Sequence, residues 1–297
     1  MRNLFRAFIF KLRRDLTFRI TLFIGIGMAV FMTGAFALID LLSWLGSDSE
    51  FAFTYCNGQN LLVNTLSPAS NFGLVIPILL TVFTVSEFNS GTIRNKIIAG
   101  NSKSKIYFSI LLSGLIFTFV VIIAYVGLCV GLASILGKFN PNGTILAMNN
   151  LTATINGAFN GATISPEFVW KIVVIGITVY ITVTAMTVFF STLFRNMGPC
   201  IPIIIILLLF FSLESMIASM FALDDNLDTA AVAIITTSRI INPLYALNSY
   251  DIKHISESVT KFTITDQNLI IHVCNNLVYT TLFTLGGWLI FRKRDVK

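Results

Sequence analysis

The chain has 297 residues, of which 55% are hydrophobic and 11% are charged, whereas soluble domains carry about 25% charged residues. Its net charge of +6 comes largely from Lys and Arg residues beside long apolar runs, so the charge does not indicate nucleic-acid binding. This composition excludes an ordinary soluble domain. It predicts an all-α integral membrane protein in which residues 1–297 form a single transmembrane domain.

The first predicted element is an amphipathic stretch over residues 1–19. Leu4 and Phe8 share one helical face, and Arg6 and Arg13 lie on another. Such a helix can lie in the membrane interface, with its cations near anionic lipid head groups. A plain basic flank that orients the first span explains the pattern equally well. Both interpretations place the N-terminus in the cytoplasm.

Six segments are apolar and long enough to span a membrane, whose hydrocarbon core of about 30 Å takes about 20 helical residues to cross. The predicted spans are about 20–42, 70–87, 106–136, 170–194, 200–223 and 269–291. We expect a kink at Pro77 in the short second span. The third span is the longest and should be tilted or project beyond the bilayer.

The basic residues favour six spans with both termini in the cytoplasm. Most Lys and Arg residues then fall on the inner side, as the positive-inside rule requires. The exceptions are Lys138, Lys171, Arg239, Lys253 and Lys261. A seventh span over the apolar stretch 230–241 would put the basic C-terminal tail outside. We therefore expect that stretch to be a re-entrant or interfacial helix.

Two acids fall at or within a predicted span, where a charge is costly. Asp40 ends the first span and is expected to reach the outer interface. Glu214 lies deeper, in the fifth span. Hydrogen bonding to neighbouring loops and a role in the transport pathway or a subunit interface are both open for Glu214.

The sequence contains no recognisable catalytic or metal-binding motif. It lacks a G-x-x-x-x-G-K-[ST] phosphate loop and an H-E-x-x-H pair, so we expect neither an ATPase nor a metal site in this chain. The four cysteines lack metal-ligand spacing. Cys56 and Cys274 both fall on the predicted outer side, which leaves open whether they form a disulfide.

Residues 87–105 form a polar, basic loop between the second and third spans. Gly91 and Gly100 bracket eight residues in which Ile93 and Ile97 lie four apart, on one helical face. The polar residues between them point elsewhere. This pattern predicts a short amphipathic helix, which is suited to act as a lever for a soluble partner.

The loop resembles the corresponding segment in the transmembrane subunits of type-2 ABC exporters. In that family the second span is followed by an acidic residue, Gly-Thr-x-Arg, a further Gly and Ser-Lys/Arg. The residues singled out here, with Asn95 and Ile97 added from the same helix, are Glu87, Gly91, Thr92, Arg94, Asn95, Ile97, Gly100, Ser102 and Lys103. The aromatic-basic-acidic end of the last span and the N-terminal helix are also similar. One departure is Ile110, where relatives often carry a basic residue.

The resemblance implies a coupling helix in this loop that docks on a separate ATP-binding subunit. The chain would then be a permease subunit without ATPase activity or a cofactor of its own, and the partner would bind ATP and Mg. Because six spans line half a pathway, a second permease copy or a paralogue is expected. The implied location is the plasma membrane of a bacterial cell.

The resemblance and the Phe-rich spans together favour a hydrophobic or amphipathic cargo, such as a peptide antibiotic, a drug or a lipid-like molecule, moved outward. The alternative is a secondary transporter or channel driven by an ion gradient. That class would call for several charges within the membrane or an internal inverted repeat.

Glu87 lies at the inner end of its span, where a negative charge is unfavourable for the helix dipole. We expect a cation to offset it, either Arg94 or a residue of the ATP-binding subunit. Glu87 and Arg94 are both predicted to act through the lever and not through contact with cargo.

Overall fold

The computed structural model describes residues 10, 14–45, 53, 55–66, 71–137, 144–145, 162–164, 166–221, 237–238, 241–244, 251–256 and 259–293. Most of the predicted N-terminal helix lies outside these residues. So do most of the 230–241 stretch and the tail beyond Lys293.

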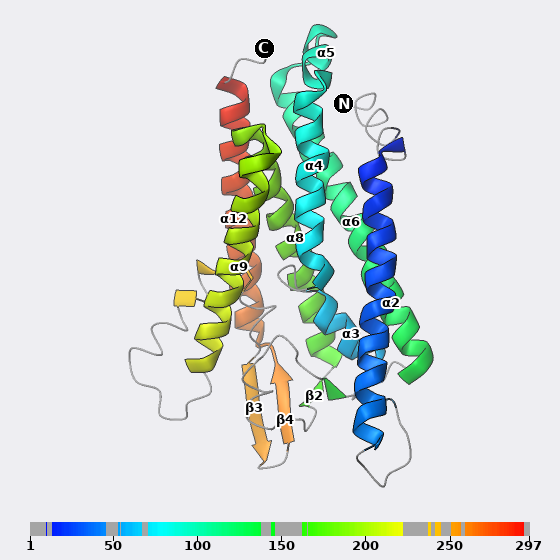
Figure 1. The fold of residues 1–297 in the computed structure, drawn as a ribbon. Coiled ribbons are helices and arrows are strands. Elements are labelled where there is room, and N and C mark those ends of the chain that lie inside the picture. Colours follow the sequence, from blue (N-terminus) through cyan, green and yellow to red (C-terminus); the bar gives the residue numbers. More distant parts are fainter. Residues whose placement is uncertain are drawn as a thin grey trace.

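Long helices lie side by side and form a bundle (Figure 1). Within the described residues, five helices are long and apolar enough to cross a membrane. These are α2 (Leu16–Leu45), α6 (Lys103–Gly137), α8 (Pro166–Phe194), α9 (Met197–Phe221) and α12 (Asp266–Lys293). They are compatible with the predicted multi-pass membrane protein, and each covers a predicted span.

The remaining predicted span corresponds to a broken helix. A 3-10 turn, η1 (Asn71–Leu74), leads into α4 (Val75–Asn89), which is followed by α5 (Thr92–Ile98) after a bend of 52°. Taken together, α4 and α5 qualify as a sixth span. The expected kink at Pro77 is not required, because Pro77 lies in the first turn of α4. A proline there removes no helix hydrogen bond, since the first N–H groups of a helix have no partner within it.

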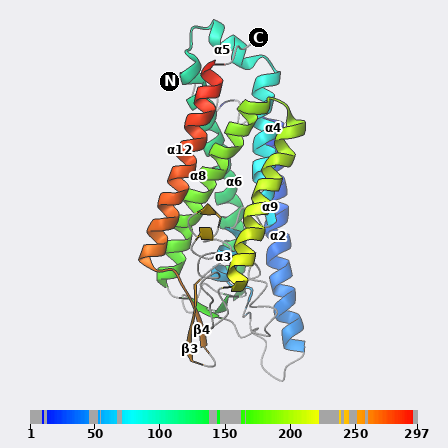
Figure 2. The same cartoon turned by 90° about the vertical axis from the view of Figure 1, so that its left-hand side faces the viewer.

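The two ends of the bundle differ in structure. The start of α2, the end of α12 and α5 lie at one end, which we call the α5 end (Figures 1 and 2). A small sheet lies at the opposite end, which we call the sheet end. Its strands are β1 (Thr144–Ile145), β2 (Ala162–Ile164), β3 (Asp251–Ser256) and β4 (Val259–Thr263).

The sheet has the order β1-β2-β4-β3, with β2 and β4 parallel and the other pairs antiparallel. Thr163 of one predicted outer loop pairs with Lys261 of another. The sequence analysis did not predict these strands. Pairing between loops about a hundred residues apart leaves no local periodicity to detect.

The segment between the first two predicted spans also contains an element that the sequence analysis did not predict. The short helix α3 (Gly58–Thr65) lies inside the bundle near the sheet end and packs against α6. Asn57 caps it, because its side-chain oxygen accepts a hydrogen bond from the Asn60 N–H at 2.8 Å. The polar composition of residues 58–65 gave no indication of a buried helix.

Helices α8 and α12 are joined by a polar seam. The Thr182 hydroxyl lies 3.0 Å from the Asn276 carbonyl oxygen and 3.0 Å from the Thr280 hydroxyl. The Asn276 side-chain amide donates to the Thr178 hydroxyl at 3.2 Å. In lipid the hydrophobic effect does not drive two helices together, so close packing and hydrogen bonds of this kind hold them.

Replacing Thr182 by Val should therefore weaken the bundle. Such bonds contribute about 0.6 kcal/mol on average and up to about 1.7 kcal/mol, so we expect a loss of about 1 kcal/mol in the free energy of unfolding. Unfolding of the detergent-solubilised chain measures it. Thr281→Val is the matched control, because Thr281 is exposed and its hydroxyl bonds to carbonyls of its own helix. An equal loss in both variants would show that the seam contributes nothing specific.

Candidate functional site

Two glycines set the limits of α5. Gly91 has φ of 66° and Gly100 has φ of 81°, values that favour glycine because it has no side chain. The helix ends at Ile98, with Ala99 as its C-cap, which matches the bracketed segment predicted from the sequence. The hydroxyls of Ser90 and Thr92 lie 2.5 Å apart across the bend.

The apolar face of α5 rests on three long helices. Ile93 is 1% exposed and packs in a cluster that we call the α5 core. Its other buried members are Ile106, Tyr107 and Ile110 of α6, Val188 of α8 and Phe291 of α12. Ile97 packs at the edge of the same cluster, so the predicted pairing of Ile93 and Ile97 on one face is confirmed.

The α5 core also explains the departure at Ile110. Ile110 is 2% exposed and belongs to this cluster. A basic side chain at that position would be buried among apolar groups, which is costly without a counter-charge. The isoleucine therefore suits the packing of this chain.

The buried acid Glu87 pairs with Lys96. Glu87 is fully buried at the end of α4, and the Lys96 ammonium lies 2.8 Å from its Oε2 atom. Arg94, one of the two partners expected from the sequence, is instead exposed. The bend at Gly91 brings Lys96 back over α4, which the spacing along the chain did not indicate. The pair offsets the unfavourable position of a carboxylate at a helix C-terminus.

The outer face of α5 is exposed. Arg94 and Asn95 lie on it, and Ile98 is 73% exposed. The sequence analysis singled out Ile97 and missed Ile98, although Ile98 follows Arg94 by four residues and so shares its face. We call Arg94, Asn95 and Ile98 the α5 outer face. It combines a cation, an amide and an isolated apolar side chain.

The start of α6 completes the loop. Ser102 precedes the helix, and the Lys105 N–H lies 3.4 Å from its hydroxyl oxygen. Lys103 donates to the Arg292 carbonyl oxygen at 3.3 Å. Both residues belong to the set predicted from the family resemblance, and both lie next to α5.

The end of α12 is attached to the same place. The Trp288 indole N–H donates to the Ser104 hydroxyl at 2.9 Å. The centroid of the Phe291 ring lies 6.1 Å from that of Phe88 on α4 and 5.9 Å from that of Tyr107 on α6. Two stretches that resemble the exporter family, the loop and the end of the last span, therefore lie against each other.

Glu214 makes a contact with a neighbouring segment. The Asn242 side-chain amide donates to the Glu214 carboxylate and to the Phe211 carbonyl oxygen. The Asn242 side-chain oxygen accepts from the Leu244 N–H at 2.8 Å. Glu214 thus ties α9 to residues 241–244, as expected for the alternative in which this acid bonds to a loop.

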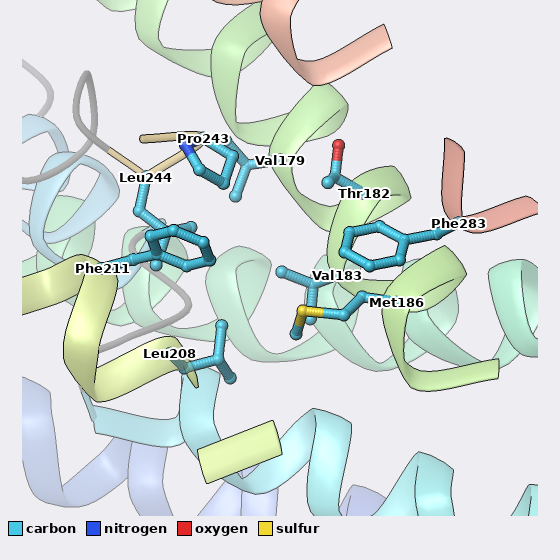
Figure 3. A pocket seen from close by; sticks show the side chains of 9 residues that line it. All are labelled: Val179, Thr182, Val183, Met186, Leu208, Phe211, Pro243, Leu244 and Phe283. Atoms are coloured by element: carbon cyan, nitrogen blue, oxygen red, sulfur yellow. The ribbon is translucent and has the colours of Figure 1, made fainter. Parts of the chain in front are cut away.

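An apolar pocket lies beside this contact, between α8, α9 and α12 (Figure 3). Thr182 supplies the one hydroxyl among its lining side chains. The lining residues are Val179, Thr182, Val183, Met186, Leu208, Phe211, Pro243, Leu244 and Phe283.

The cysteines are free thiols. Cys56 is buried near the sheet end, where its sulfur lies 3.6 Å from the Thr33 carbonyl oxygen. Cys274 is exposed on α12. The structure therefore contains no bond between the two residues for which a disulfide was left open.

Comparisons of the chain with known protein families, curated proteins and solved structures find no match. An assignment of function consequently depends on the residues and their arrangement.

The pairing of Glu87 with Lys96 predicts an asymmetric response to substitution. Lys96→Met removes the ammonium beside a fully buried carboxylate and should destabilise the chain by about 3 kcal/mol, as expected for a broken buried pair. Glu87→Gln should cost less, because Lys96 is partly exposed, and the double variant should recover most of the loss. Thermal unfolding in detergent measures all three.

Arg94→Met is the control for this series, since Arg94 is exposed and its loss should leave the melting temperature unchanged. If Arg94→Met were as harmful as Lys96→Met, Lys96 would not be the cation on which Glu87 depends.

Proposed function

We propose that the chain is the membrane-spanning permease subunit of an ABC exporter, with six crossings and the α5 end in the cytoplasm. The observation that carries the proposal is the two-sided character of α5. Its inner face, at Ile93, is packed on α6, α8 and α12, whereas its outer face is open. A helix held in this way can receive a force from a soluble partner and pass it to three spans.

The outer face favours a protein partner. Ile98 offers apolar surface that a groove on an ATP-binding subunit would bury, and burial of such a side chain contributes about 1.5–3 kcal/mol. Arg94 and Asn95 beside it supply a cation and hydrogen-bonding groups that orient the contact. Arginine is one of the residue types enriched among the few positions that dominate the binding energy of an interface.

The mechanism we propose is alternating access. ATP binding closes two ATP-binding subunits, which displaces α5 in each of two permease copies. The displacement reaches α6 and α12 through the α5 core, because Ile93, Tyr107 and Phe291 belong to the same packed cluster. Two copies are needed since one bundle of this size lines half a pathway.

The proposed cargo is hydrophobic or amphipathic and is moved outward through the plasma membrane. The long apolar helices carry few charged side chains with which to bind a sugar or an ion. The pocket of Figure 3 has apolar walls but is too small to hold a cargo molecule, so it supports this proposal only by its apolar character. Cargo of this kind can enter from the bilayer without losing a hydration shell.

Changes on the α5 outer face should uncouple the complex and leave the fold intact. We expect Ile98→Ser to lower retention of an ATP-binding subunit about tenfold or more, because a central apolar anchor is lost. Arg94→Ala should lower the cargo-stimulated ATPase rate of the assembled complex. Co-purification without crosslinker and ATPase assays in proteoliposomes measure these effects.

Ile135→Ser is the matched control, because Ile135 is 80% exposed but lies on α6 close to the sheet end. The Ile135→Ser variant should bind the ATP-binding subunit as the wild type does. Transport by the purified chain alone, driven by an ion gradient, would instead favour the secondary transporter. Equal binding by Ile98→Ser and Ile135→Ser would remove α5 as the docking element.

A further inference from the structure

The helix α3 is enclosed by protein although its sequence is polar. Seven of its eight residues are buried, among them Gln59, Asn60 and Asn64. A helix at a surface buries one face, so burial on nearly all sides means that the surrounding bundle encloses α3. It lies near the sheet end between the long helices (Figures 1 and 2).

Several of its polar groups bond within the segment 55–66. The Asn60 amide donates to the Tyr55 carbonyl oxygen at 2.6 Å, and the Asn64 amide donates to the Asn60 side-chain oxygen at 2.9 Å. The Thr65 hydroxyl donates to the Leu61 carbonyl oxygen at 2.6 Å. These bonds move with the segment, so they are kept if α3 shifts as one body.

A carboxylate on α2 binds the start of the segment. Asp40 is 1% exposed, and its two oxygens accept the Tyr55 N–H at 2.8 Å and the Cys56 N–H at 2.6 Å. Charge-assisted bonds to backbone N–H groups are strong, particularly away from water. Asp40, which was expected at the outer interface, is therefore a buried clamp.

The backbone of the same segment also lies very close to α6. A Cβ atom at Gly137, the last residue of α6, would collide with the Cys56 carbonyl oxygen. The buried position of α3, which we call its seat, thus needs both the Asp40 clamp on α2 and a glycine at the end of α6.

One buried side chain raises the free energy of the seated position of α3. Both polar atoms of the fully buried Gln59 side chain lack a hydrogen-bond partner in the described part of the chain. A buried amide without partners loses the free energy of its hydration and regains it when water reaches it. The seated state is therefore opposed by Gln59 and secured by Asp40.

We propose that α3 is a movable element of the sheet end, which rests in its seat inside the bundle and leaves it as a unit when the bundle rearranges. The link between this movement and transport depends on the proposed function. The unseating of α3 does not, and it is testable in the isolated chain.

Cys56 is a natural reporter of the seat. Burial, reinforced by the nearby Asp40 carboxylate, raises the pKa of its thiol to about 11, so the thiol is protonated at neutral pH. A return to the ordinary value of 9.0 alone would raise the thiolate fraction about 100-fold, and thiolate is the form that reacts. Cys129, buried between α2 and α6, reports on the rest of the bundle.

The experiment measures labelling of the full chain in membrane vesicles by a membrane-impermeant maleimide added at the sheet end. Cys274→Ser removes the exposed cysteine from the background. Asp40→Asn and Gly137→Ala should each raise the labelling rate of Cys56 at least about tenfold. Gly131→Ala, in the same helix but with open space around its Cβ position, should leave the rate unchanged.

A second reporter separates movement of α3 from a change in the Cys56 thiol itself. Thr65→Cys, in a chain whose Cys56 and Cys274 are Ser, places a thiol at the far end of α3. This thiol should also react faster in Asp40→Asn and Gly137→Ala. Unchanged labelling of Thr65→Cys would overturn unseating as a unit, and equally faster labelling of Cys129 would reveal general loosening and overturn it too.

The link to transport has its own test in the complex with an ATP-binding subunit. Labelling of Cys56 should rise during ATP turnover and return to its resting rate when ATP is removed. Labelling at the same rate with and without turnover would mean that α3 does not move during transport, which would overturn this link. If no ATP-binding subunit associates with the chain, the proposed function fails, whereas the Asp40→Asn and Gly137→Ala measurements still decide whether α3 unseats.

Discussion

Polar groups within an apolar bundle must find their partners in the protein, because hydrocarbon supplies none. This constraint accounts for the main connections between helices. Glu87 binds Lys96, Asp40 binds the backbone before α3, and Asn276 binds the threonines of α8. In each case the polar contact joins two elements, so groups that are costly to bury also determine how the elements are arranged.

The proposed lever α5 and the proposed movable helix α3 lie at opposite ends of α6. Its first turns supply Ile106 and Tyr107 to the α5 core, and its last residue, Gly137, abuts Cys56. The helix has 35 residues, about 50 Å at 1.5 Å per residue. A rigid helix of that length converts a small tilt at one end into a displacement at the other. The long helix that was expected to tilt or project beyond the bilayer therefore also connects the α5 end to the sheet end.

The pair formed by Glu87 and Lys96 has a second consequence for α5. It fixes the angle between α4 and α5, because the ammonium must reach back across the bend to the end of α4. The same angle places Ile93 in the α5 core and leaves Ile98 exposed. Residues that are close in sequence therefore have opposite environments, and in the proposed function they have opposite roles, one in transmission and one in contact with a partner.

The sequence by itself determined the long apolar helices, the polar loop and the limits of α5. These depend on local properties, namely long apolar runs along the chain and the two glycines with positive φ that bracket α5. The grouping of Ile93 with Ile97 followed from helical spacing. Each of these signals lies within a few turns, so no knowledge of the fold was needed.

Only the tertiary structure decided which groups meet. The choice of Lys96 over Arg94 depended on the direction of a bend, and the burial of α3 depended on three helices far apart in the sequence. Its amides resemble those of a solvated loop, because composition does not record what surrounds a segment. Pairing between distant segments, such as β2 with β4 or Asp40 with Cys56, is a property of the folded chain alone.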